Sequence, residues 1–518
     1  MASLLALTLL PLLLAGAQAA TPGVQHIRGT SWPSPVALVQ CLDTHHIPYR
    51  VTSSPDWAEY ATTFNARLQY IPAAIALPNT TDHVSSAVMC ASKTGFPVQP
   101  KSGGHSYASF STGGRNGILM ISLENFNSIK LDNKTGVAMV GGGVRLGNLA
   151  QGIWDQGRRA LGHGTCPGVG IGGHFTHGGY GYSSRLLGLA LDQIIALDVI
   201  LANGSYVHTD SQSYPDIYYA LRGAADSFGI VTTFYLQTSA APETVINFSY
   251  SFPDALTSVS NAVATFKGVQ KFSLNGSVVN RNIGFGITIA GNATGYTVHG
   301  TYFGSFASYN KTIAPALLGQ IPFRPSNEST VQETDWITSL VQLGGAPNLT
   351  VPLHGYTERD NFYAKSVTTT EPFNDKALER FFLWAYTAGR GKNSPVDWFS
   401  IINLYGGPDS AIGRYNEEFA AYAGYDDLWV VQNYGSAPMN QQFPKAGLAF
   451  LDSLNGAMTS AMPEYAAYLN YIDPSYSREQ AYRLYYGEEL FKRLKELKKQ
   501  LDPKDVFWNP QSIPIGSH

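Results

Sequence analysis

The feature that most constrains this chain is a glycine-rich block at residues 162–181, which reads GHGTCPGVGIGGHFTHGGYG. Ordering a glycine costs up to about 1 kcal/mol more than ordering an alanine, because glycine loses more backbone freedom. A long stretch without Cβ atoms is therefore expected where a ligand or another part of the protein must approach the backbone closely. The block also contains the residue Cys166 and several histidines.

Two kinds of ligand could lie against this block. His163-x-x-Cys166 and His174-x-x-His177 have a spacing that suits a zinc site. A structural zinc site does not need glycines between and beyond its ligands, so this interpretation is the weaker one and we predict no metal. The favoured alternative is a flat cofactor that lies against the glycine backbone, with the sulfur of Cys166 as the reactive atom.

A second glycine-rich segment, Lys101-Ser102-Gly103-Gly104-His105-Ser106-Tyr107, follows a predicted strand at 97–100. Such a run lets successive backbone N–H groups turn toward an anion. It matches neither a GxGxxG motif that opens a helix nor a Walker A lysine motif. Taken alone, the segment is also consistent with an ordinary loop.

Composition and the N-terminus favour an exported protein. The net charge of −3 lacks the basic surplus of a nucleic-acid binder. Only 14% of the residues are charged, against roughly 25% in an average domain. Residues 1–19 are predicted to be a signal peptide, since the apolar run at 4–14 is too short to span a bilayer and small residues follow it. We therefore expect a secreted, extracellular protein that does not contact a membrane or nucleic acid.

Glycosylation and cysteine usage support the same compartment. Nine Asn-x-Ser/Thr sequons are candidate glycan sites, at Asn79, Asn133, Asn203, Asn247, Asn275, Asn292, Asn310, Asn327 and Asn348. In an oxidising compartment Cys41 and Cys90 can form a disulfide, which leaves Cys166 without a partner. A buried, inert thiol would also account for the odd cysteine.

The hydrophobic pattern predicts mixed α and β structure. Strands are expected at 74–77, 97–100, 117–121, 194–201 and 205–209, and helices at 83–94 and 146–154. From about Ala240 the hydrophobic pattern of the sequence changes. Alternating strand patterns such as 283–289 and 297–303 are typical of an antiparallel sheet with covering helices. A single helix is predicted for 478–501.

Further motifs make the chain resemble a known family. They are Leu221-Arg222-Gly223 before Phe228-Gly229-Ile230-Val231, Tyr468-x-Asn470-Tyr471-x-Asp473, and an ending with Asp502-Pro503 and Gln511-Ser512-Ile513-Pro514. With the two glycine-rich segments, they resemble the berberine-bridge-enzyme-like branch of the FAD-linked oxidases, especially the secreted gluco-, xylo- and chito-oligosaccharide oxidases. The resemblance covers essentially the whole mature chain.

The resemblance implies an α+β fold with a vanillyl-alcohol-oxidase/PCMH-type FAD-binding domain from 20–238 and 465–518. It implies a substrate domain from 239–464, with an antiparallel sheet covered by helices. It also implies FAD attached covalently through His105 and Cys166, which would account for the odd cysteine. The other FAD contacts that it implies are Ser102, Gly103, Gly104, Ser106, Thr165, Val169, Gly170, Gly173, His174, Gly179, Ile230 and Asn470.

The resemblance implies that Tyr471 removes the proton of the anomeric hydroxyl while the hydrogen on that carbon leaves to the flavin. A phenol has a pKa near 10, so we expect the site to lower it. Some of these oxidases carry an aspartate beside the tyrosine, where this chain has Asn403; Tyr434 is a second candidate base. The sugar contacts that we expect are Tyr107, Thr165, Asp360, Phe399, Ile401, Gln432 and Tyr434. The apolar Ile401 favours a sugar without an exocyclic hydroxymethyl group, such as xylose.

We therefore expect a monomeric oxidase that converts a reducing-end hemiacetal into a lactone and reduces O2 to hydrogen peroxide. Val169 is expected to leave room for O2 beside the flavin. Two alternatives stay open: an oxidase of alkaloids or other aromatic metabolites, and a non-catalytic secreted glycan-binding protein.

Overall fold

The computed structural model describes residues 34–291, 295–356, 358–391 and 394–516. The predicted signal peptide and the sequon at Asn292 lie outside the described residues. Within them, Cys41 and Cys90 form a disulfide, and Cys166 is a free cysteine. None of the described helices is both long and apolar enough to cross a membrane.

The first sheet is small and largely parallel. In spatial order its strands are β1 (Tyr49–Arg50), β2 (Ala74–Ala76), β4 (Leu119–Ser122) and β3 (Val98–Lys101). The disulfide joins α1 (Val36–Thr44) to α3 (Thr81–Thr94) beside it. The sequence favours α3 because Thr80 caps its first turn through His83 N and Gly95 ends it at φ +77°. The first glycine-rich segment begins at the end of strand β3.

The second sheet is antiparallel. Its strands, in spatial order, are β5 (Ile129–Asp132), β6 (Val137–Gly141), β10 (Gly229–Gln237), β8 (Ile194–Leu201) and β9 (Tyr206–Asp210). The turn at Asn203 and Gly204 joins β8 to β9, as the sequence predicts, and Gly204 adopts φ +81°. Along the chain, α4 (Leu146–Gly157) and α5 (Ile171–Thr176) follow β6 and precede β8. Helix α5 is formed by residues of the glycine block.

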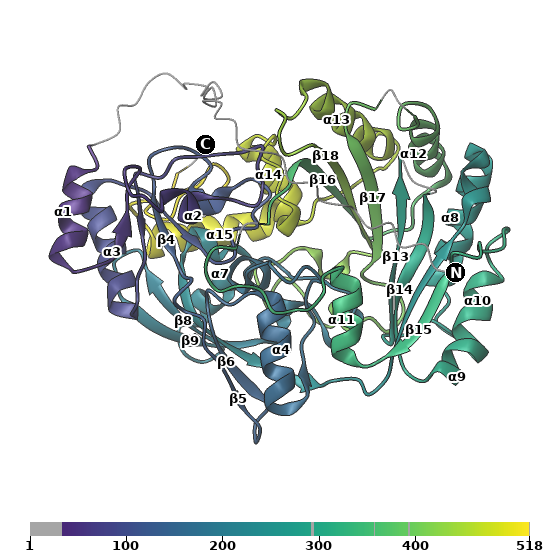
Figure 1. Ribbon diagram of the computed structural model, residues 1–518, viewed down its shortest axis with the longest axis horizontal. Coiled ribbons are helices and arrows are strands. Elements are labelled where there is room, and N and C mark those ends of the chain that lie inside the picture. The colour runs from purple at the N-terminus through teal and green to yellow at the C-terminus, as the bar shows by residue number, and fades with distance from the viewer. Residues whose placement is uncertain (1–33, 292–294, 357, 392–393, 517–518) are drawn as a thin grey trace, which may run out of the picture. The chain divides into compact units, whose positions relative to one another are not determined.

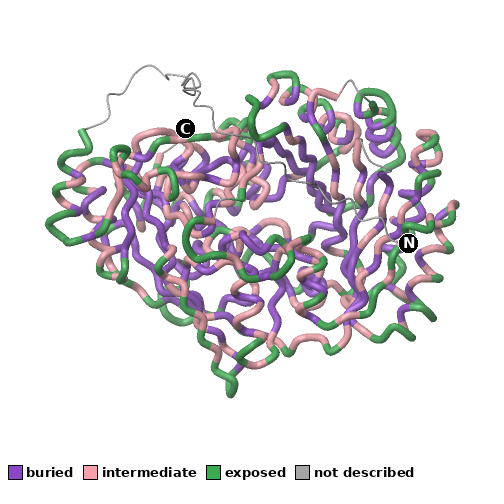
Figure 2. The backbone as a smooth tube through the Cα atoms, viewed as in Figure 1, coloured by how far each residue is buried: buried purple, intermediate pink, exposed green. Residues whose placement is uncertain are grey.

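The third sheet is large and antiparallel, as predicted for the middle of the chain. Its strands, in spatial order, are β15 (Thr330–Thr334), β12 (Val245–Ser251), β14 (Tyr296–Phe303), β13 (Ile283–Ala290), β17 (Asp397–Leu404), β18 (Trp429–Ala437) and β16 (Asn361–Thr369). Helices α8 (Val259–Ser273), α12 (Asp375–Thr387) and α13 (Lys445–Thr459) pack on one face (Figure 1). In Figure 2 the strands of this sheet are mostly buried, and the helices beside them carry exposed residues on their outer turns.

The two faces of β17 show how this sheet builds a site. Successive side chains of a strand point to opposite faces. Trp398, Ile402 and Leu404 therefore join the hydrophobic core under the helices. The alternate residues Phe399 and Ile401 point away from that core, into a cavity.

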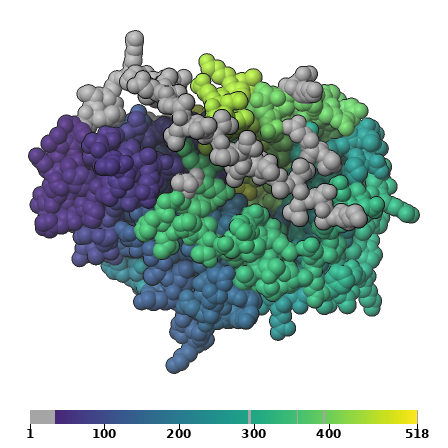
Figure 3. Space-filling view, in the orientation of Figure 1, coloured from purple at the N-terminus to yellow at the C-terminus, as the bar shows by residue number. Residues whose placement is uncertain are grey.

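The C-terminal segment returns to the first two sheets. The predicted single helix at 478–501 is wrong: the structure has α14 (Arg478–Tyr485) and α15 (Gly487–Leu501), because Gly487 adopts φ +69° and interrupts the helical hydrogen bonds. A β-bridge then pairs Phe507 with Val98 of β3. In Figure 3 the first third of the chain (purple and blue) and its middle (teal and green) gather on different sides of the view.

The remaining elements are short. They are α2 (Trp57–Ala61), β7 (Arg159–Ala160), α6 (Ser184–Leu187), α7 (Pro215–Ala224), β11 (Ser239–Ala240), α9 (Phe306–Ser308), α10 (Ala314–Leu318), α11 (Trp336–Gly344), and short turns of tighter or wider helix.

Candidate active site

A cavity of about 570 Å³ gathers the predicted site residues. Its lining comes from the first glycine-rich segment, the glycine block, residues 468–472, and the face of the large sheet opposite the helices. All predicted cofactor, substrate and catalytic residues line it except two. Gly179 instead donates its N–H to the Tyr468 hydroxyl at 2.9 Å, and the Ile230 side chain is buried in a hydrophobic core with Val98 and Phe507.

The two glycine-rich segments touch each other backbone to backbone. A Cβ on Gly103 would lie 2.2 Å from Gly170 N, and one on Gly170 would lie 2.0 Å from Gly103 N. Ser102 Oγ ties the segments together by accepting from Gly172 N at 3.2 Å. A Cβ on Gly173, in contrast, would meet no atom within 4 Å. Part of the glycine content thus allows close backbone packing, and part leaves open space for a ligand.

His105 offers a nitrogen that the protein does not use. Its ring stacks on Phe64 with the centroids 4.3 Å apart. Its Nε2 atom is buried and has no hydrogen-bond partner among the described residues. Burial, together with the charges of Arg145 and Lys101, lowers the pKa of His105 to about 3. The ring is therefore neutral at physiological pH and keeps a nucleophilic lone pair.

Cys166 lies on the wall of the same cavity, with its side chain open to it. Burial raises the pKa of the thiol, followed by the charge of Glu358. The zinc alternative is not supported in the described structure, where His163, Cys166, His174 and His177 do not converge on one point.

His174 is held as a neutral ring. Its Nε2 accepts a hydrogen bond from Gly164 N at 2.9 Å, so the ring proton is on Nδ1. Burial lowers the pKa of His174 to about 3. A Cβ on Gly164 would lie 2.9 Å from the ring, which explains a glycine at that position.

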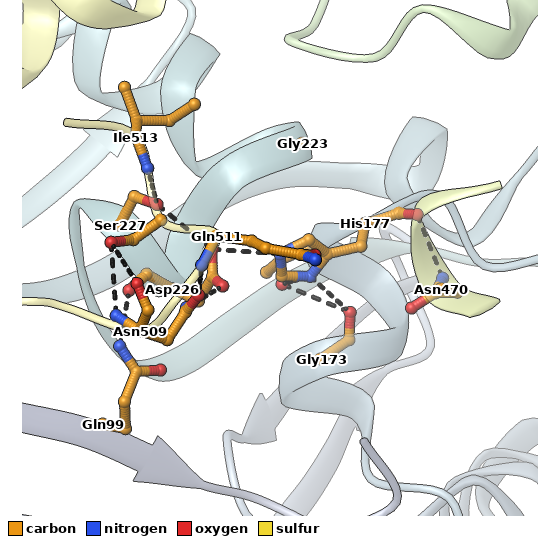
Figure 4. A network of polar contacts seen from close by, with 12 residues as sticks. Gln99, Gly173, His177, Gly223, Asp226, Ser227, Asn470, Asn509, Gln511 and Ile513 are labelled. Carbon is orange, nitrogen blue, oxygen red and sulfur yellow. Dashed lines mark hydrogen bonds and ion pairs between the residues drawn. The ribbon is translucent and has the colours of Figure 1, made fainter. Parts of the chain in front are cut away.

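A polar network that the sequence did not predict borders the same cavity through His177 and Asp226 (Figure 4). His177 Nε2 lies 3.3 Å from the Asp226 carboxylate, which also accepts from Asn509 Nδ2 at 2.8 Å. The Asp226 hydrogen bond and charge oppose the effect of burial and raise the pKa of His177. In the sequence His177 suggests only a possible zinc ligand, and no local pattern indicates Asp226, which is 49 residues away.

The sheet side of the cavity carries paired polar side chains. Gln432 Nε2 donates to the Tyr107 hydroxyl at 2.6 Å, and the Tyr434 hydroxyl donates to Asp360 Oδ2 at 2.6 Å. Burial raises the pKa of Tyr434, and the charge of Asp360 adds to the effect. Tyr434 is therefore held as a hydrogen-bond donor and is disfavoured as a base.

Tyr471 sits between two other tyrosines. Its ring stacks on Tyr107 with the centroids 5.5 Å apart and meets Tyr468 edge to face at 4.9 Å. We expected the protein to lower the pKa of this phenol. That expectation is wrong when only the protein's own groups are considered, because burial raises the pKa well above its usual value. After burial, the neighbouring groups that raise this pKa most are Tyr107 and Tyr468.

Asn403 lines the cavity, and its Oδ1 atom lies beside Gly286 of β13, where a Cβ would be 2.2 Å away. Its Oδ1 atom is buried and has no hydrogen-bond partner among the described residues. The strand register places Asn403 one step beyond Ile401, which is paired with Gln432 on β18. This amide oxygen therefore keeps an unused capacity to accept a hydrogen bond.

Comparisons with known proteins agree with this site. Residues 72–210 match the family described as FAD binding domain, and residues 467–514 match the family described as berberine and berberine like. The chain is 38% identical over 485 residues to the xylooligosaccharide oxidase of Thermothelomyces thermophilus, covering 92% of this chain and 94% of that protein.

Solved structures show the same fold. A xylooligosaccharide oxidase from Myceliophthora thermophila in complex with xylobiose superposes with a TM-score of 0.87 at 37% identity, covering 93% of this chain and all of that one. Glucooligosaccharide oxidase from Acremonium strictum, described with a 6-S-cysteinyl, 8α-N1-histidyl FAD, gives a TM-score of 0.85 at 30% identity, with 93% and 100% covered.

Proposed function

Because this chain belongs to the berberine-bridge-enzyme-like family of FAD-linked oxidases, we propose that it oxidises the reducing-end anomeric carbon of an oligosaccharide to a lactone. It is an FAD-dependent carbohydrate oxidase. The observation that carries the proposal is the shared cavity, in which an unused histidine nitrogen, a free thiol and a set of sugar-compatible polar groups meet. Neither alternative, an alkaloid oxidase or a non-catalytic binding protein, is favoured by the comparisons.

The residues of the cavity fit FAD. Its orphaned His105 Nε2, the open Cys166 thiol and the bare backbone at Gly173 are consistent with a large cofactor that reacts with both side chains. We assign covalent attachment to His105 and Cys166. When bound there, FAD would supply the two-electron oxidation of the substrate carbon and the reduction of O2 to hydrogen peroxide. Val169 lines the cavity and would leave room for O2.

Tyr471 is the proposed proton acceptor for the anomeric hydroxyl. Tyr434 is a poorer candidate, because its phenolate would lie beside the Asp360 carboxylate, whose oxygen already accepts its proton at 2.6 Å. Since burial raises the pKa of Tyr471, the reactive phenolate forms only at alkaline pH. Asn403 Oδ1 can orient the phenol or the sugar by accepting a hydrogen bond, but it cannot take up the proton.

The sugar is proposed to lie against the sheet, between Tyr107, Gln432, Asp360 and the apolar side chains of Phe399 and Ile401. Gln432 and Asp360 supply polar atoms that already anchor two tyrosines. The apolar wall at Ile401 favours xylose, which lacks an exocyclic hydroxymethyl group. Thr165, next to Cys166, would contact both sugar and cofactor.

The proposal includes secretion and a division into two domains. Seven of the eight described sequon asparagines are exposed, which supports glycosylation in an export pathway. We propose that residues 20–238 and 465–518 bind FAD and that 239–464 bind substrate, because β12 to β18 build one sheet while Phe507 returns to β3.

The experiment that tests the function is a panel of xylo-, cello- and chito-oligosaccharides read by peroxide release. Oxidation of xylobiose with a higher kcat/KM than cellobiose is expected. Peroxide from an aromatic alkaloid and from no oligosaccharide would overturn the proposal.

A further inference from the structure

The segment that carries Tyr471 lies along the edge of the large sheet. Strand β16 is the edge strand next to β18, and its Thr368 forms a β-bridge with Ala466. The short turn Leu469–Tyr471 follows Ala466. We call residues 466–475 the base segment, because they carry the proposed base. The place of the Tyr471 oxygen therefore depends on how the rest of the protein holds this segment.

Neighbouring residues of β16 face opposite sides of the sheet. Ser366 lies directly opposite Gln432, which lines the cavity, and Ser366 Oγ accepts a hydrogen bond from Tyr468 N at 3.0 Å. The next side chain, Lys365, points to the other face, where α13 packs. Its Nζ atom lies 3.1 Å from Asp452 Oδ1 of that helix. Lys365 is therefore behind the sheet, on the side away from the cavity.

Lys365 forms a buried ion pair with Asp473 of the base segment. The Lys365 Nζ atom lies 2.5 Å from Asp473 Oδ2, and the two side chains are 8% and 1% exposed. The same Nζ donates to the Tyr363 hydroxyl at 3.0 Å and to Ser475 Oγ at 3.3 Å. Separating a buried pair is strongly unfavourable, because each charge would be left buried without compensation. The pair therefore resists any displacement of this end of the base segment.

The backbone of Asp473 is fixed as well as its carboxylate. Its N–H donates to the Tyr485 hydroxyl at 2.8 Å, and its carbonyl oxygen accepts from Gln511 Nε2 at 2.8 Å. Its second carboxylate oxygen, Oδ1, accepts from Ser475 N at 2.9 Å. Because Asp473 follows Tyr471 so closely in the chain, a shift of Asp473 also moves the backbone that carries the phenol.

The Tyr471 side chain is guided by ring contacts. It stacks on Tyr107 and meets Tyr468 edge to face, and its N–H donates to Tyr468 O at 2.9 Å within the turn. Stacked rings slide over one another more easily than hydrogen-bonded atoms separate. A general base must lie about 2.6–3.2 Å from the atom that gives up its proton. The reach of the phenol oxygen is therefore set by the backbone of the base segment.

We propose that Lys365 is a positioning residue for the oxidation. Through its ion pair with Asp473 it holds the Tyr471 oxygen within reach of the anomeric hydroxyl, although Lys365 itself lies behind the sheet. The inference rests on the proposed function, which assigns the proton transfer to Tyr471. A displacement of about 1 Å at a reacting group slows a reaction about 100-fold. Loss of the pair is therefore expected to slow the chemical step far more than it weakens sugar binding.

Two variants of the holoenzyme and a matched control test this role. Lys365→Met breaks the pair and leaves the Asp473 charge buried. The double variant Lys365→Met with Asp473→Asn removes both charges, so it keeps the test possible if the single variant does not fold. The control is Lys498→Met, because Lys498 Nζ lies 2.8 Å from Asp502 Oδ2 in another fully buried pair, and neither residue lines the cavity. It should carry a similar cost in stability without touching the base segment.

Stopped-flow reduction at a series of xylobiose concentrations separates the limiting rate from the apparent Kd. Both Lys365 variants are expected to lower the limiting rate per bound flavin by about tenfold or more and to change the Kd by less than about threefold. Lys498→Met should keep both values within about threefold of the wild type. A limiting rate near that of the wild type in the folded Lys365 variants, or an equal loss in Lys498→Met, overturns the proposal.

Hydrogen exchange of the holoenzyme, read by peptide mass spectrometry, tests the same anchor without sugar. The N–H groups of Tyr468, Tyr471 and Asp473 are hydrogen-bonded, so their exchange reports on the base segment. Their exchange is expected to be about tenfold faster in the Lys365 variants and unchanged in Lys498→Met. Unchanged exchange in the Lys365 variants would also overturn the proposal. A wild type whose flavin no oligosaccharide reduces would instead contradict the proposed function, and the exchange rates would still decide whether Lys365 holds the segment.

Discussion

At the residue scale, the identity of the base decides the chemistry. Tyr471→Phe keeps the ring that stacks on Tyr107 and removes only the oxygen. We expect flavin reduction by the oligosaccharide to slow by about 10²–10⁴-fold, the usual contribution of a positioned base. Stopped-flow absorbance measures this step separately from reoxidation. If the Tyr471→Phe variant reduces its flavin as fast as the wild type and the Tyr434→Phe variant does not, the base is Tyr434.

The raised pKa of Tyr471 gives a prediction with a definite sign. If the phenolate is the active form, the rate of flavin reduction rises with pH through the alkaline range, because the pKa lies well above 10. Asn403→Asp would add a negative charge to the cavity and move the rising limb to still higher pH. The check is the pH dependence of the reduction rate in both proteins. A wild-type plateau below pH 8 would mean that the loaded site lowers the pKa instead.

At the element scale, the glycine block has two kinds of glycine that substitution can separate. Gly170→Ala would place a methyl group 2.0 Å from Gly103 N, so we expect a loss of about 3 kcal/mol or more, at the upper end for overpacking. Gly173→Ala meets no atom within 4 Å and should leave folding intact while hindering FAD loading. Thermal unfolding and the flavin-to-protein absorbance ratio measure the two effects. Equal stability of both variants would contradict this account.

The packing around Asn247 on β12 indicates that this sequon carries no glycan. Asn247 is half-buried, and its Nδ2 donates to Gln342 Oε1 at 2.8 Å while its Oδ1 accepts from Ser339 Oγ at 2.9 Å. A glycan needs that nitrogen at an open surface. Glycopeptide mapping of the secreted protein is expected to find glycans at exposed sites such as Asn133 and none at Asn247. Full occupancy of Asn247 would contradict the packing of α11 on β12.

Local patterns of the sequence predicted many elements, and tertiary context explains the failures. The buried run at 194–201 became β8, since a short apolar stretch of β-branched residues fits a central strand. The helix at 478–501 was predicted without its break, because Gly487 is one small residue in a strongly helical pattern. The residues of the site were recognised through the resemblance, not through spacing.

At the scale of the whole molecule, the cavity depends on contacts between distant segments that no local pattern reveals. His177 and Asp226 pair at 3.3 Å, and Asn509 joins them from 283 residues further along the chain. The hydrogen bond from Tyr434 to Asp360 likewise joins β18 to the residue directly before β16. Such pairs follow from the topology, so the sequence could suggest the residues but not their partners.

The disulfide ties the N-terminal helices together. Cys41 and Cys90 close a loop over a sequence separation of 49 residues. Replacing both by serine is expected to lower the free energy of unfolding by at most about 4 kcal/mol. Flavin content should be unchanged in the fraction that folds, because Cys166 is not part of the bridge. Denaturant unfolding gives the first quantity, and a disulfide mapped to Cys166 would contradict the assignment.

Anaerobic mixing of the yellow holoenzyme with a reducing oligosaccharide tests most directly whether the protein oxidises the anomeric carbon. Xylobiose should bleach the flavin absorbance, because its hemiacetal can lose the hydroxyl proton to Tyr471 and the hydrogen of the anomeric carbon, together with two electrons, to FAD. The matched control is xylobiose reduced with borohydride, which keeps the second sugar but has no hemiacetal and should leave the colour unchanged. Bleaching by the reduced sugar, or none by any reducing oligosaccharide, would contradict the account.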